Sequence, residues 1–528
     1  MLEFSELSPI DGSLAATEPL TREYCSEPVW RRSVPVVSFF VLLVIGVLLR
    51  LIGITRQSLW LDEAFSVFLA AHSFPVILKF VAGSDAHPPL YYLILHVWLV
   101  FGPSVLAMRL LSALASIASL VLMFLLSCRL ANRRVALLAT ALLTLSAFQV
   151  WYAQEVRMYA LTTLAVLAAL YALVRARQRG GSGNWLLFIG AMLTALYLDY
   201  SAFYVYSALV IWFIMIGWQD ARIRVPFVLS GFALCLAYLP WLPAFWQQLG
   251  HIGGLTAWIA GANGSGVIGV FRDLFFNRTN LAKPDSGLVA MVLGVLSLGF
   301  VAIAFWLPRR APAYPLLAFW LGWPCILGIA TEILNHPMLI ARNVMVVQPA
   351  LFLLLALAAE AIWEPYAQGR PVPVRLVLLV ICLGIFIVTN IQAQAVSWST
   401  TVKEDWRSAA ALVAANEHDG DLVLFNAYFT QMPFDYYYHR DIGLREPVVV
   451  ERGYQLEESL LYADLAQTSP GMVSGPDMSG YAHVWLVLSH AGVPDNAAVP
   501  PWIAAHYQFV REWRFVGITV RLYQAPLT

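Results

Sequence analysis

Residues 34–54 read VPVVSFFVLLVIGVLLRLIGI and begin shortly after the basic pair Arg31-Arg32. As a helix, this run is long enough to cross the ~30 Å hydrocarbon core of a bilayer. It is longer than the apolar core of a signal peptide, and no small-residue cleavage site follows it. The stretch therefore predicts an uncleaved first membrane span.

The same kind of apolar run recurs along most of the chain. Of the 528 residues, 60% are apolar and only 12% are charged, and the mean hydropathy is +0.70. Soluble domains carry about twice that share of charge, so the composition indicates a polytopic membrane protein. The further runs are 104–128, 135–148, 158–174, 184–199, 201–218, 225–243, 287–307, 314–331, 343–362 and 375–395. Together they predict eleven spans, with short runs such as 135–148 as boundary errors or broken helices lining a cavity.

Charge sets the orientation and excludes one class of partner. With a cytoplasmic N-terminus, the inside segments hold 15 Lys and Arg in 50 residues, and the outside loops hold 7 in 111. This asymmetry follows the positive-inside rule, so we expect a multi-pass plasma (inner) membrane protein with an extracytoplasmic C-terminus. The formal net charge is zero, and the basic excess of a nucleic-acid-binding protein is therefore absent.

Three regions are expected. Residues 1–30 are polar and acidic and predict a disordered cytoplasmic tail. Residues 31–396 form the all-α membrane domain, and residues 397–528 are richer in charge. In this last region a helix-like stretch at 403–416 precedes strand-like segments at 421–426, 483–489 and 514–523, which predict a small α+β extracytoplasmic domain.

The first outer loop, residues 56–103, contains the motif Trp60-Leu61-Asp62-Glu63-Ala64-Phe65-Ser66. Asp62 and Glu63 lie just beyond the first span, where partial desolvation can raise the basicity of a carboxylate and suit it to act as a general base. The alternative is structural: Asp62 caps a helix that runs through Ala71, with its acidic neighbour in the first turn.

A second motif of this loop reads Asp85-Ala86-His87-Pro88-Pro89-Leu90-Tyr91-Tyr92. Its polar residues, Asp85 and His87, are candidates for substrate binding. The alternative is a rigid helix start, because proline in the first turn of a helix loses no hydrogen bond.

The second outer loop contributes Gln154, Glu155, Arg157 and Tyr159. Strongly polar residues at a membrane boundary are by default candidates for a functional site. The alternative is an Arg157–Glu155 pair that anchors the loop at the interface.

The fourth outer loop contributes His336 and Arg342, the latter at the mouth of the tenth predicted span. An arginine at an outer helix end opposes the positive-inside trend and needs a local anion. Phosphate suits it, because a guanidinium binds phosphate with two parallel hydrogen bonds and stays charged when desolvated. The alternative is snorkelling to lipid headgroups.

Five motifs in one order resemble a known family. They are WLDEAFS at 60–66, DAHPPLYY at 85–92, AMRLLSAL at 107–114, YAQEVRMY at 152–159 and KEDWR at 403–407. They resemble the bacterial branch of the protein O-mannosyltransferase-like (GT39-type) glycosyltransferases, which belong to the GT-C superfamily together with the aminoarabinose lipid A transferases. The resemblance covers about residues 35–410.

The resemblance implies a polyprenyl-phosphate-sugar donor and an inverting sugar transfer at the extracytoplasmic face. It implies that Asp62, with Glu63 beside it, is the catalytic base. Some relatives carry a phosphate-contacting lysine where this chain has His87, which could act there only as a donor. Some also carry an aspartate where this chain has Tyr159, and Glu155 is then the substitute. The metal contact of some relatives is not clearly matched, so a divalent cation stays open.

A transferase of this kind must deprotonate an acceptor hydroxyl and stabilise the departing phosphate. Asp62 would perform the first task, and Arg342 with Arg157 the second. The acceptor, whether lipid, glycan or protein, and the sugar are left open by the sequence. The main alternative is a transporter or flippase of lipid-linked sugars, which predicts ionisable residues near the middle of the spans rather than at their outer ends.

Overall fold

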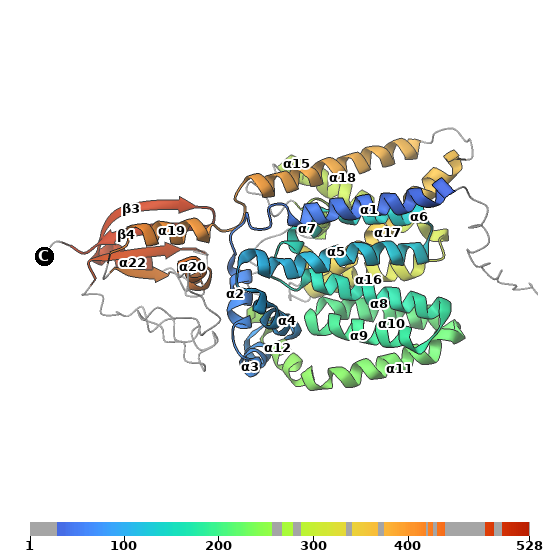
Figure 1. Cartoon of the computed structure of the whole chain (residues 1–528), viewed down its shortest axis with the longest axis horizontal. Coiled ribbons are helices and arrows are strands. Elements are labelled where there is room, and N and C mark those ends of the chain that lie inside the picture. Colours follow the sequence, from blue (N-terminus) through green and yellow to red (C-terminus); the bar gives the residue numbers. More distant parts are fainter. Residues whose placement is uncertain are drawn as a thin grey trace, which may run out of the picture.

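The computed structural model of the chain describes residues 29–255, 267–277, 287–333, 340–367, 374–418, 421–425, 430–438, 481–489 and 499–526. Most of the described elements are helices that run side by side, and a small sheet lies at one end of this bundle (Figure 1). This confirms the predicted helical membrane protein with a small sheet near its C-terminus. The predicted tail, residues 1–30, lies almost wholly outside the described residues.

Seven helical stretches among the described residues are long and apolar enough to cross a membrane. An eighth candidate is the pair formed by α6 (Arg133–Leu145) and α7 (Ala147–Ala153), which bends by 60°. The seven are α5 (Val105–Leu130), α8 (Tyr159–Arg179), α11 (Ala221–Tyr238) continued by η4 (Leu239–Trp241) and α12 (Leu242–Leu255), α15 (Gly287–Trp306) with η5 (Leu307–Arg310), α16 (Tyr314–Ile333), η6 (Ala341–Val347) with α17 (Gln348–Ala367), and α18 (Val374–Ser399).

Shorter apolar helices account for the remaining predicted runs. They are α1 (Val29–Leu51), α9 (Ser182–Leu198) and α10 (Ser201–Met215), while the bent pair is α6 (Arg133–Leu145) and α7 (Ala147–Ala153). Each of the eleven predicted runs therefore coincides with a helix or a bent helix pair. The number of spans itself stays a prediction. Two further elements, η3 (Gly217–Gln219) and α14 (Val267–Phe276), complete this part of the chain.

The bend between α6 and α7 has identifiable hydrogen-bond partners. The end of α6 presents carbonyl groups that have no partner within the helix. The guanidinium of Arg50, fully buried in α1, donates to the carbonyl oxygens of Leu143 and Thr144, each at 3.3 Å. Across the bend, the side-chain oxygen of Asn390 accepts the backbone N–H of Ala147 at 2.7 Å. The short run predicted here is therefore one arm of a broken helix, held by polar side chains.

The first outer loop forms a compact cap at the end of the bundle beside the sheet (Figure 1). It consists of α2 (Leu61–Ala70), α3 (Phe74–Ser84), α4 (Leu90–Trp98) and η2 (Leu99–Phe101). Tyr91, Tyr92 and Leu95 of α4 are fully buried in the main apolar core. The cap is thus packed onto the bundle, and its polar residues are held in fixed positions.

The C-terminal region folds around a four-stranded mixed sheet of order β1-β2-β4-β3. The strands β1 and β2 are parallel, and the other two pairs are antiparallel. Trp406 and Trp485 are buried in its core. The elements are α19 (Trp406–Asn416), β1 (Leu422–Phe425), α20 (Gln431–Tyr438), β2 (His483–Leu488), α22 (Val499–His506), β3 (Gln508–Phe515) and β4 (Ile518–Gln524).

One strand prediction was wrong. The single strand expected over 514–523 contains the end of β3, a turn and most of β4, because the chain reverses at Val516-Gly517. Gly517 has a φ of 71°, in the left-handed region that glycine adopts without strain. The alternating apolar pattern continues on both sides of the turn, which is why the pattern alone did not reveal it.

The C-terminal region docks onto the first outer loop through specific bonds. The side-chain amide of Gln57 donates to the carbonyl oxygens of Ser397 and Thr400, at 2.7 and 2.8 Å. The hydroxyl of Tyr437 in α20 accepts the backbone N–H of Leu59 at 2.7 Å. Residues far apart in sequence are thereby joined around the start of α2.

Candidate active site

The helix α2 directs its two adjacent carboxylates into different surroundings. The N-cap position is Trp60, and no side chain caps the helix. The capping role considered for Asp62 is therefore not what the structure shows. Both acidic residues lie in the first turn, where the helix dipole favours negative charge. Their side chains have separate partners, so the two carboxylates differ in charge environment and in access.

Glu63 is fully buried and accepts four hydrogen bonds. Arg109 binds it with a fork, Nε to Oε1 at 2.9 Å and Nη2 to Oε2 at 2.7 Å. The backbone N–H of Val156 donates to Oε1 at 2.9 Å, and the ammonium of Lys403 lies 3.2 Å from Oε2. Burial alone would raise the pKa of Glu63, but Arg109 and Lys403 outweigh it and lower that pKa to about 2. Its carboxylate is thus a fixed anion with both oxygens occupied.

Arg109 connects the carboxylate of Glu63 to the backbone of the residues just before α2. It comes from α5 and also donates to the carbonyl oxygens of Ile54, Gln57 and Ser58, at 2.8 to 3.0 Å. With Glu63, these partners occupy the guanidinium on all three nitrogens. The motif around Arg109 did not by itself indicate a role for this arginine. The available signal was an arginine close to the outer end of a predicted span.

Lys403 connects the C-terminal region to the same cluster. Its ammonium lies 2.9 Å from Oε1 of Glu155 and 4.9 Å from the ring centre of Trp151. Burial raises the pKa of Glu155, and Lys403 opposes that rise while the charge of Glu63 adds to it. On balance the pKa of Glu155 is raised. Of the two buried glutamates, Glu63 therefore holds its negative charge firmly, whereas Glu155 takes up a proton more readily. The role of Lys403 was likewise not apparent from its motif.

Asp62 lies at a more open position. Nη1 of Arg342 lies 3.0 Å from its Oδ2, and the two side chains are 16% and 26% exposed, Arg342 first. The guanidinium of Arg342 also lies over the ring of Trp60, 5.9 Å from its centre. Burial raises the pKa of Asp62, but Arg342, Arg157 and His87 together lower it below its ordinary value of 3.8. Arg342 therefore points into the site instead of outward toward lipid headgroups.

Arg157 reaches the same place from the second outer loop. Its Nη1 donates to the hydroxyl of Ser66 at 3.2 Å, and its Nη2 lies 3.3 Å from Nε2 of His87. The Arg157–Glu155 pair considered as the structural alternative is not formed, and among the described residues no carboxylate pairs directly with Arg157. Its Nε is buried and has no hydrogen-bond partner within this part of the chain. A buried guanidinium with an unsatisfied donor is well suited to an external anion, and the nearby carboxylates of Asp62 and Asp85 stabilise its own charge.

His87 is held by Asp85. The Nδ1 of His87 lies 3.0 Å from Oδ1 of Asp85, which also accepts the backbone N–H of Ala86 at 2.6 Å. The tautomer with its proton on Nδ1 satisfies this bond and leaves Nε2 to accept from Arg157. In that tautomer His87 orients Arg157, which differs from the donor role to phosphate considered from the sequence. The helix start considered for this motif is also present, since α4 begins at Leu90 directly after the two prolines.

Tyr159 and Gln154 take different positions. Tyr159 is buried at the start of α8, with its ring 6.0 Å from the guanidinium of Arg157. The amide of Gln154 instead donates to the carbonyl oxygens of Leu49, Arg50 and Ile52, at 2.9 to 3.3 Å. Gln154 thus satisfies carbonyl groups at the end of α1. His336 lies outside the described residues.

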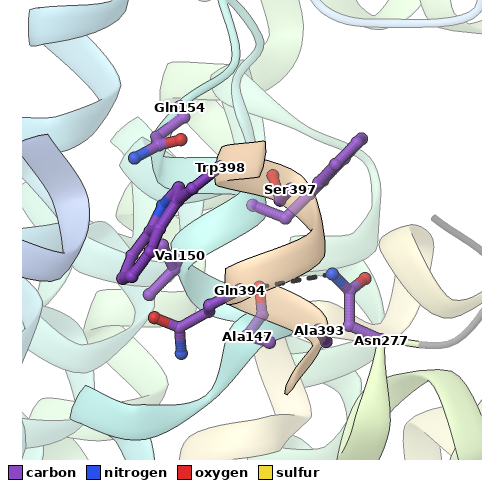
Figure 2. A pocket seen from close by; sticks show the side chains of 9 residues that line it. Ala147, Val150, Gln154, Asn277, Ala393, Gln394, Ser397 and Trp398 are labelled. Carbon is purple, nitrogen blue, oxygen red and sulfur yellow. Dashed lines mark hydrogen bonds between the residues drawn. The ribbon is translucent and has the colours of Figure 1, made fainter. Parts of the chain in front are cut away.

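A small pocket lies between α7 and α18, behind this cluster. Figure 2 shows Val150 and Ala147 of α7 facing Gln394 and Trp398 of α18, with Gln154 at one side. The pocket holds about 220 Å³ of empty space, including its mouth, and Trp151 also lines it. Because the ammonium of Lys403 contacts the ring of Trp151, this tryptophan separates the ion cluster from the pocket. The broken helix therefore lines a small pocket with room for about one water molecule, and the lined cavity considered from its length stays a prediction.

The residues around Asp62 do not form a three-ligand metal group in the described part of the chain. The carboxylates of Glu63 and Asp85 are engaged by Arg109 and His87 instead. The sequence left a divalent cation at this site open, and it stays open.

Comparisons with known proteins agree with this architecture. Residues 86–243 match the sequence model of the family described as dolichyl-phosphate-mannose-protein mannosyltransferase. This segment includes His87, Arg109, Glu155 and Arg157. No match was found among curated proteins.

Several solved structures share the fold. One is ArnT from Cupriavidus metallidurans bound to undecaprenyl phosphate, with a TM-score of 0.56 and 15% identity, covering 92% of this chain and 97% of that one. Another is the oligosaccharyltransferase AglB from Archaeoglobus fulgidus in complex with an inhibitory peptide and a dolichol-phosphate, with a TM-score of 0.54 and 13% identity, covering 94% and 74%.

A further Archaeoglobus fulgidus oligosaccharyltransferase structure, tethered with an acceptor peptide, matches with a TM-score of 0.52 and 12% identity. It covers 78% of this chain, which spans 64% of the length of that protein. At such identities the likeness concerns the fold. The chain thus has the fold of the GT-C glycosyltransferases, and its residues 86–243 resemble the dolichyl-phosphate-mannose-protein mannosyltransferases.

Proposed function

We propose that this protein is a membrane glycosyltransferase that moves a sugar from a polyprenyl-phosphate donor to an acceptor hydroxyl at the extracytoplasmic face, with inversion at the anomeric carbon. The fold and the family match support a lipid-linked donor, since ArnT is a relative in fold that was solved with undecaprenyl phosphate. The face of reaction rests on the Lys and Arg asymmetry of the loops.

The arrangement that carries the proposal is Asp62 between two arginines. Arg342 pairs with Asp62 at 3.0 Å, and Arg157 lies close enough to lower the pKa of the same carboxyl group. Arg157 has a buried Nε without a hydrogen-bond partner among the described residues, and Nε1 of Trp60 is in the same condition. A phosphate group entering beside Asp62 would satisfy such donors. One accessible carboxylate next to an anion site is what an inverting transfer requires.

In the proposed reaction, the acceptor hydroxyl transfers its proton to Asp62 as its oxygen attacks the anomeric carbon. The bond between that carbon and the phosphate oxygen breaks, and polyprenyl phosphate leaves with the electron pair. The donor is a singly charged phosphodiester, whereas the leaving group is a phosphate monoester of higher charge. Arg342 and Arg157 therefore interact more strongly with the transition state than with the bound donor, which is the condition for lowering the barrier.

Donor binding would also raise the pKa of Asp62. Without a donor, the arginines hold the pKa of Asp62 below its ordinary value. A bound phosphate shares these cations and reduces their pull on the carboxylate, so its proton affinity rises when the substrate is present. A base of this kind contributes about 10²–10⁴-fold to the rate.

The remaining predicted residues would position this pair. Glu63 accepts bonds from two cations and a backbone N–H, and we assign it to holding α2 in place instead of accepting the proton. Glu155 balances Lys403 in the same cluster. Asp85 and His87 orient Arg157. Tyr159 places its ring beside the guanidinium of Arg157.

The test is turnover by the purified full-length protein in lipid nanodiscs, with a panel of undecaprenyl-phosphate and dolichyl-phosphate hexoses and pentoses. We expect one donor class to be consumed, with release of polyprenyl phosphate, and Asp62→Asn to abolish consumption. Glu364→Gln, an exposed carboxylate of α17, is the matched control and should retain wild-type turnover.

Two results would overturn the proposal. Asp62→Asn with more than about a tenth of wild-type turnover would remove the base, given the expected 10²–10⁴-fold. Movement of intact donor between leaflets without release of polyprenyl phosphate would indicate a transporter instead.

A further inference from the structure

The parallel strands β1 and β2 bring an aspartate and a histidine side by side in the C-terminal region. The register pairs Leu422 with Val484, so the preceding residues, Asp421 and His483, lie next to each other at the start of the two strands. His418 follows α19 and lies one turn before Asp421. Two segments about sixty residues apart in sequence thus place two imidazoles and one carboxylate together.

The ligand atoms of these three side chains face one another. Nδ1 of His483 lies 3.0 Å from Oδ1 of Asp421, and Nδ1 of His418 lies 3.9 Å from Oδ2. All three ligand atoms lie within 4.8 Å of one another. The two imidazole centres are 5.9 Å apart, with an angle of 35° between the rings. Among the described residues, no other His, Cys, Asp or Glu group brings three such atoms this close.

The carboxylate is fixed by bonds from an indole N–H and a backbone N–H, neither of which would bind an ion. Asp421 is buried, and its Oδ2 accepts from Nε1 of Trp485 and from the backbone N–H of His418, each at 3.0 Å. Such outer bonds hold a ligating carboxylate in one orientation. His418 is 78% exposed and His483 30%, so an ion can enter from solvent, and His418 can turn toward it without disturbing the core.

We propose that His418, Asp421 and His483 form a site for one divalent transition-metal ion, with zinc as the best match. Two imidazole nitrogens and one carboxylate oxygen are borderline ligands that suit zinc better than calcium or magnesium. Tetrahedral zinc bonds of about 2.0–2.1 Å require its ligand atoms to approach within roughly 3.5 Å of one another. The pair Asp421–His483 already meets this distance, and only the exposed His418 has to move.

The ion would have a structural effect on this region. It would tie the segment after α19 to the start of the sheet, on the far side of the helix from Lys403 and the docking segment. The site has no contact with the cluster around Asp62 that the structure records, so it is separate from the proposed transferase chemistry. The rival explanation is a hydrogen bond between His483 and Asp421 that needs no ion.

The experiment uses the untagged full-length protein, stripped with chelator and exchanged into chelator-free buffer. Zinc is titrated by calorimetry, and cobalt(II) is used as a spectroscopic substitute. We expect one saturable zinc equivalent per chain, and a cobalt spectrum that reports nitrogen and oxygen ligands. His418→Ala, which removes an exposed ligand at little cost to folding, should weaken zinc binding at least tenfold.

A histidine of the same region provides the control. His506 of α22 is exposed and does not belong to the group, so His506→Ala should bind zinc as wild type does. At the same zinc concentration, zinc should also raise the thermal midpoint of wild type and of His506→Ala by more than that of His418→Ala, because an ion that binds only the folded state stabilises it according to its affinity.

Three outcomes would overturn the proposal. They are the absence of a saturable equivalent in wild type, equal zinc affinity in His418→Ala and wild type, and loss of the equivalent in His506→Ala. If His418→Ala unfolds, His483→Gln provides the second variant, with the same loss of affinity expected.

Discussion

Asp62 and Glu63 are neighbours in sequence, yet they belong to regions of opposite character. Glu63, with Arg109, Lys403 and Glu155, forms a closed cluster in which no side chain is more than 6% exposed. Asp62 and Arg342 form an open pair with 26% and 16% exposure. Both regions contain carboxylates held by cations. The two regions differ in their exposure to solvent. A substrate can reach the carboxylate of Asp62, and it cannot reach that of Glu63.

Burial decides what the loss of one partner of an ion pair costs in this fold. Removing one partner from a closed cluster leaves a charge in a medium that solvates it poorly, so the cost falls on folding. Removing a partner from the open pair leaves a charge that water or a substrate anion can reach. The same substitution, carboxylate to amide, should therefore affect activity at one position and stability at the next.

The largest effect is expected for Asp62→Asn. The amide keeps the shape of the side chain and removes the base, so turnover should fall by about 10²–10⁴-fold. The thermal midpoint should stay close to that of wild type, because the open pair contributes little to stability. Steady-state turnover and a melting curve on the same preparation measure both. If Asp62→Asn lost stability as severely as it lost turnover, the proposed difference between the open pair and the closed cluster would be wrong.

Glu63→Gln tests the closed region with the matched change. The free energy of unfolding in mixed micelles should fall by about 3–5 kcal/mol, because Arg109 and Lys403 lose their shared anion. Turnover per folded molecule should fall less than in Asp62→Asn. A stable Glu63→Gln protein without activity would move the base by one residue.

Arg342→Lys separates phosphate binding from membrane anchoring. The charge and the reach to headgroups are retained, whereas the planar fork is lost, so we expect about a tenfold loss or more of turnover. Turnover is measured at saturating and at limiting donor, and a larger loss at limiting donor indicates weakened binding as well. Wild-type turnover at both concentrations would exclude the phosphate clamp.

Lys403→Met probes how the C-terminal region supports the closed cluster. We expect a loss of about 1–3 kcal/mol in the free energy of unfolding near neutral pH. The loss should be smaller at mildly acidic pH. Glu155 has a raised pKa, so its buried carboxyl takes up a proton as the pH falls, and the unpaired negative charge disappears. A loss that does not depend on pH would contradict this account of Glu155.

The smallest effect concerns the pH dependence of kcat/KM in the wild type. The pKa of Asp62 lies below its ordinary value of 3.8 in the absence of donor. The base form therefore persists above that value, and its protonation lowers activity only as the pH falls through the lowered pKa. Between about pH 5 and pH 7 we expect less than about a twofold change from this group. An acidic limb near pH 6 would assign the base to another residue.

Much of the architecture was predictable because lipid imposes a strict pattern. A span must satisfy its own backbone polar groups and expose apolar side chains, so each of the eleven apolar runs appeared as a helix or a bent pair. The polar motifs Asp62-Glu63, Asp85–His87 and Glu155–Arg157 stood out against this background. Most of them meet at one end of the bundle, as their shared position in the outer loops suggested.

The pairing of these residues was not predictable. The sequence offered Arg157–Glu155 as a local pair, yet Arg157 contacts His87 while Glu155 contacts Lys403. Partners in these contacts are 70 and 248 positions apart. Charge and spacing along a chain limit which pairs can form locally, but they do not fix which distant element packs nearest. The hairpin at Gly517 was missed for a related reason, since the alternating pattern is the same on either side of a tight turn.

The sequence by itself determined that the chain crosses a membrane many times, that its polar groups collect in a few loops between the apolar runs, and that Asp62 is a candidate base. Only the tertiary structure decided that Asp62 lies in an open pair with Arg342 while Glu63 is enclosed by Arg109 and Lys403. The physical reason is that hydropathy is a property of each residue and its neighbours in the chain. The basicity and access of a carboxylate depend on cations, burial and hydrogen bonds that distant segments bring to it.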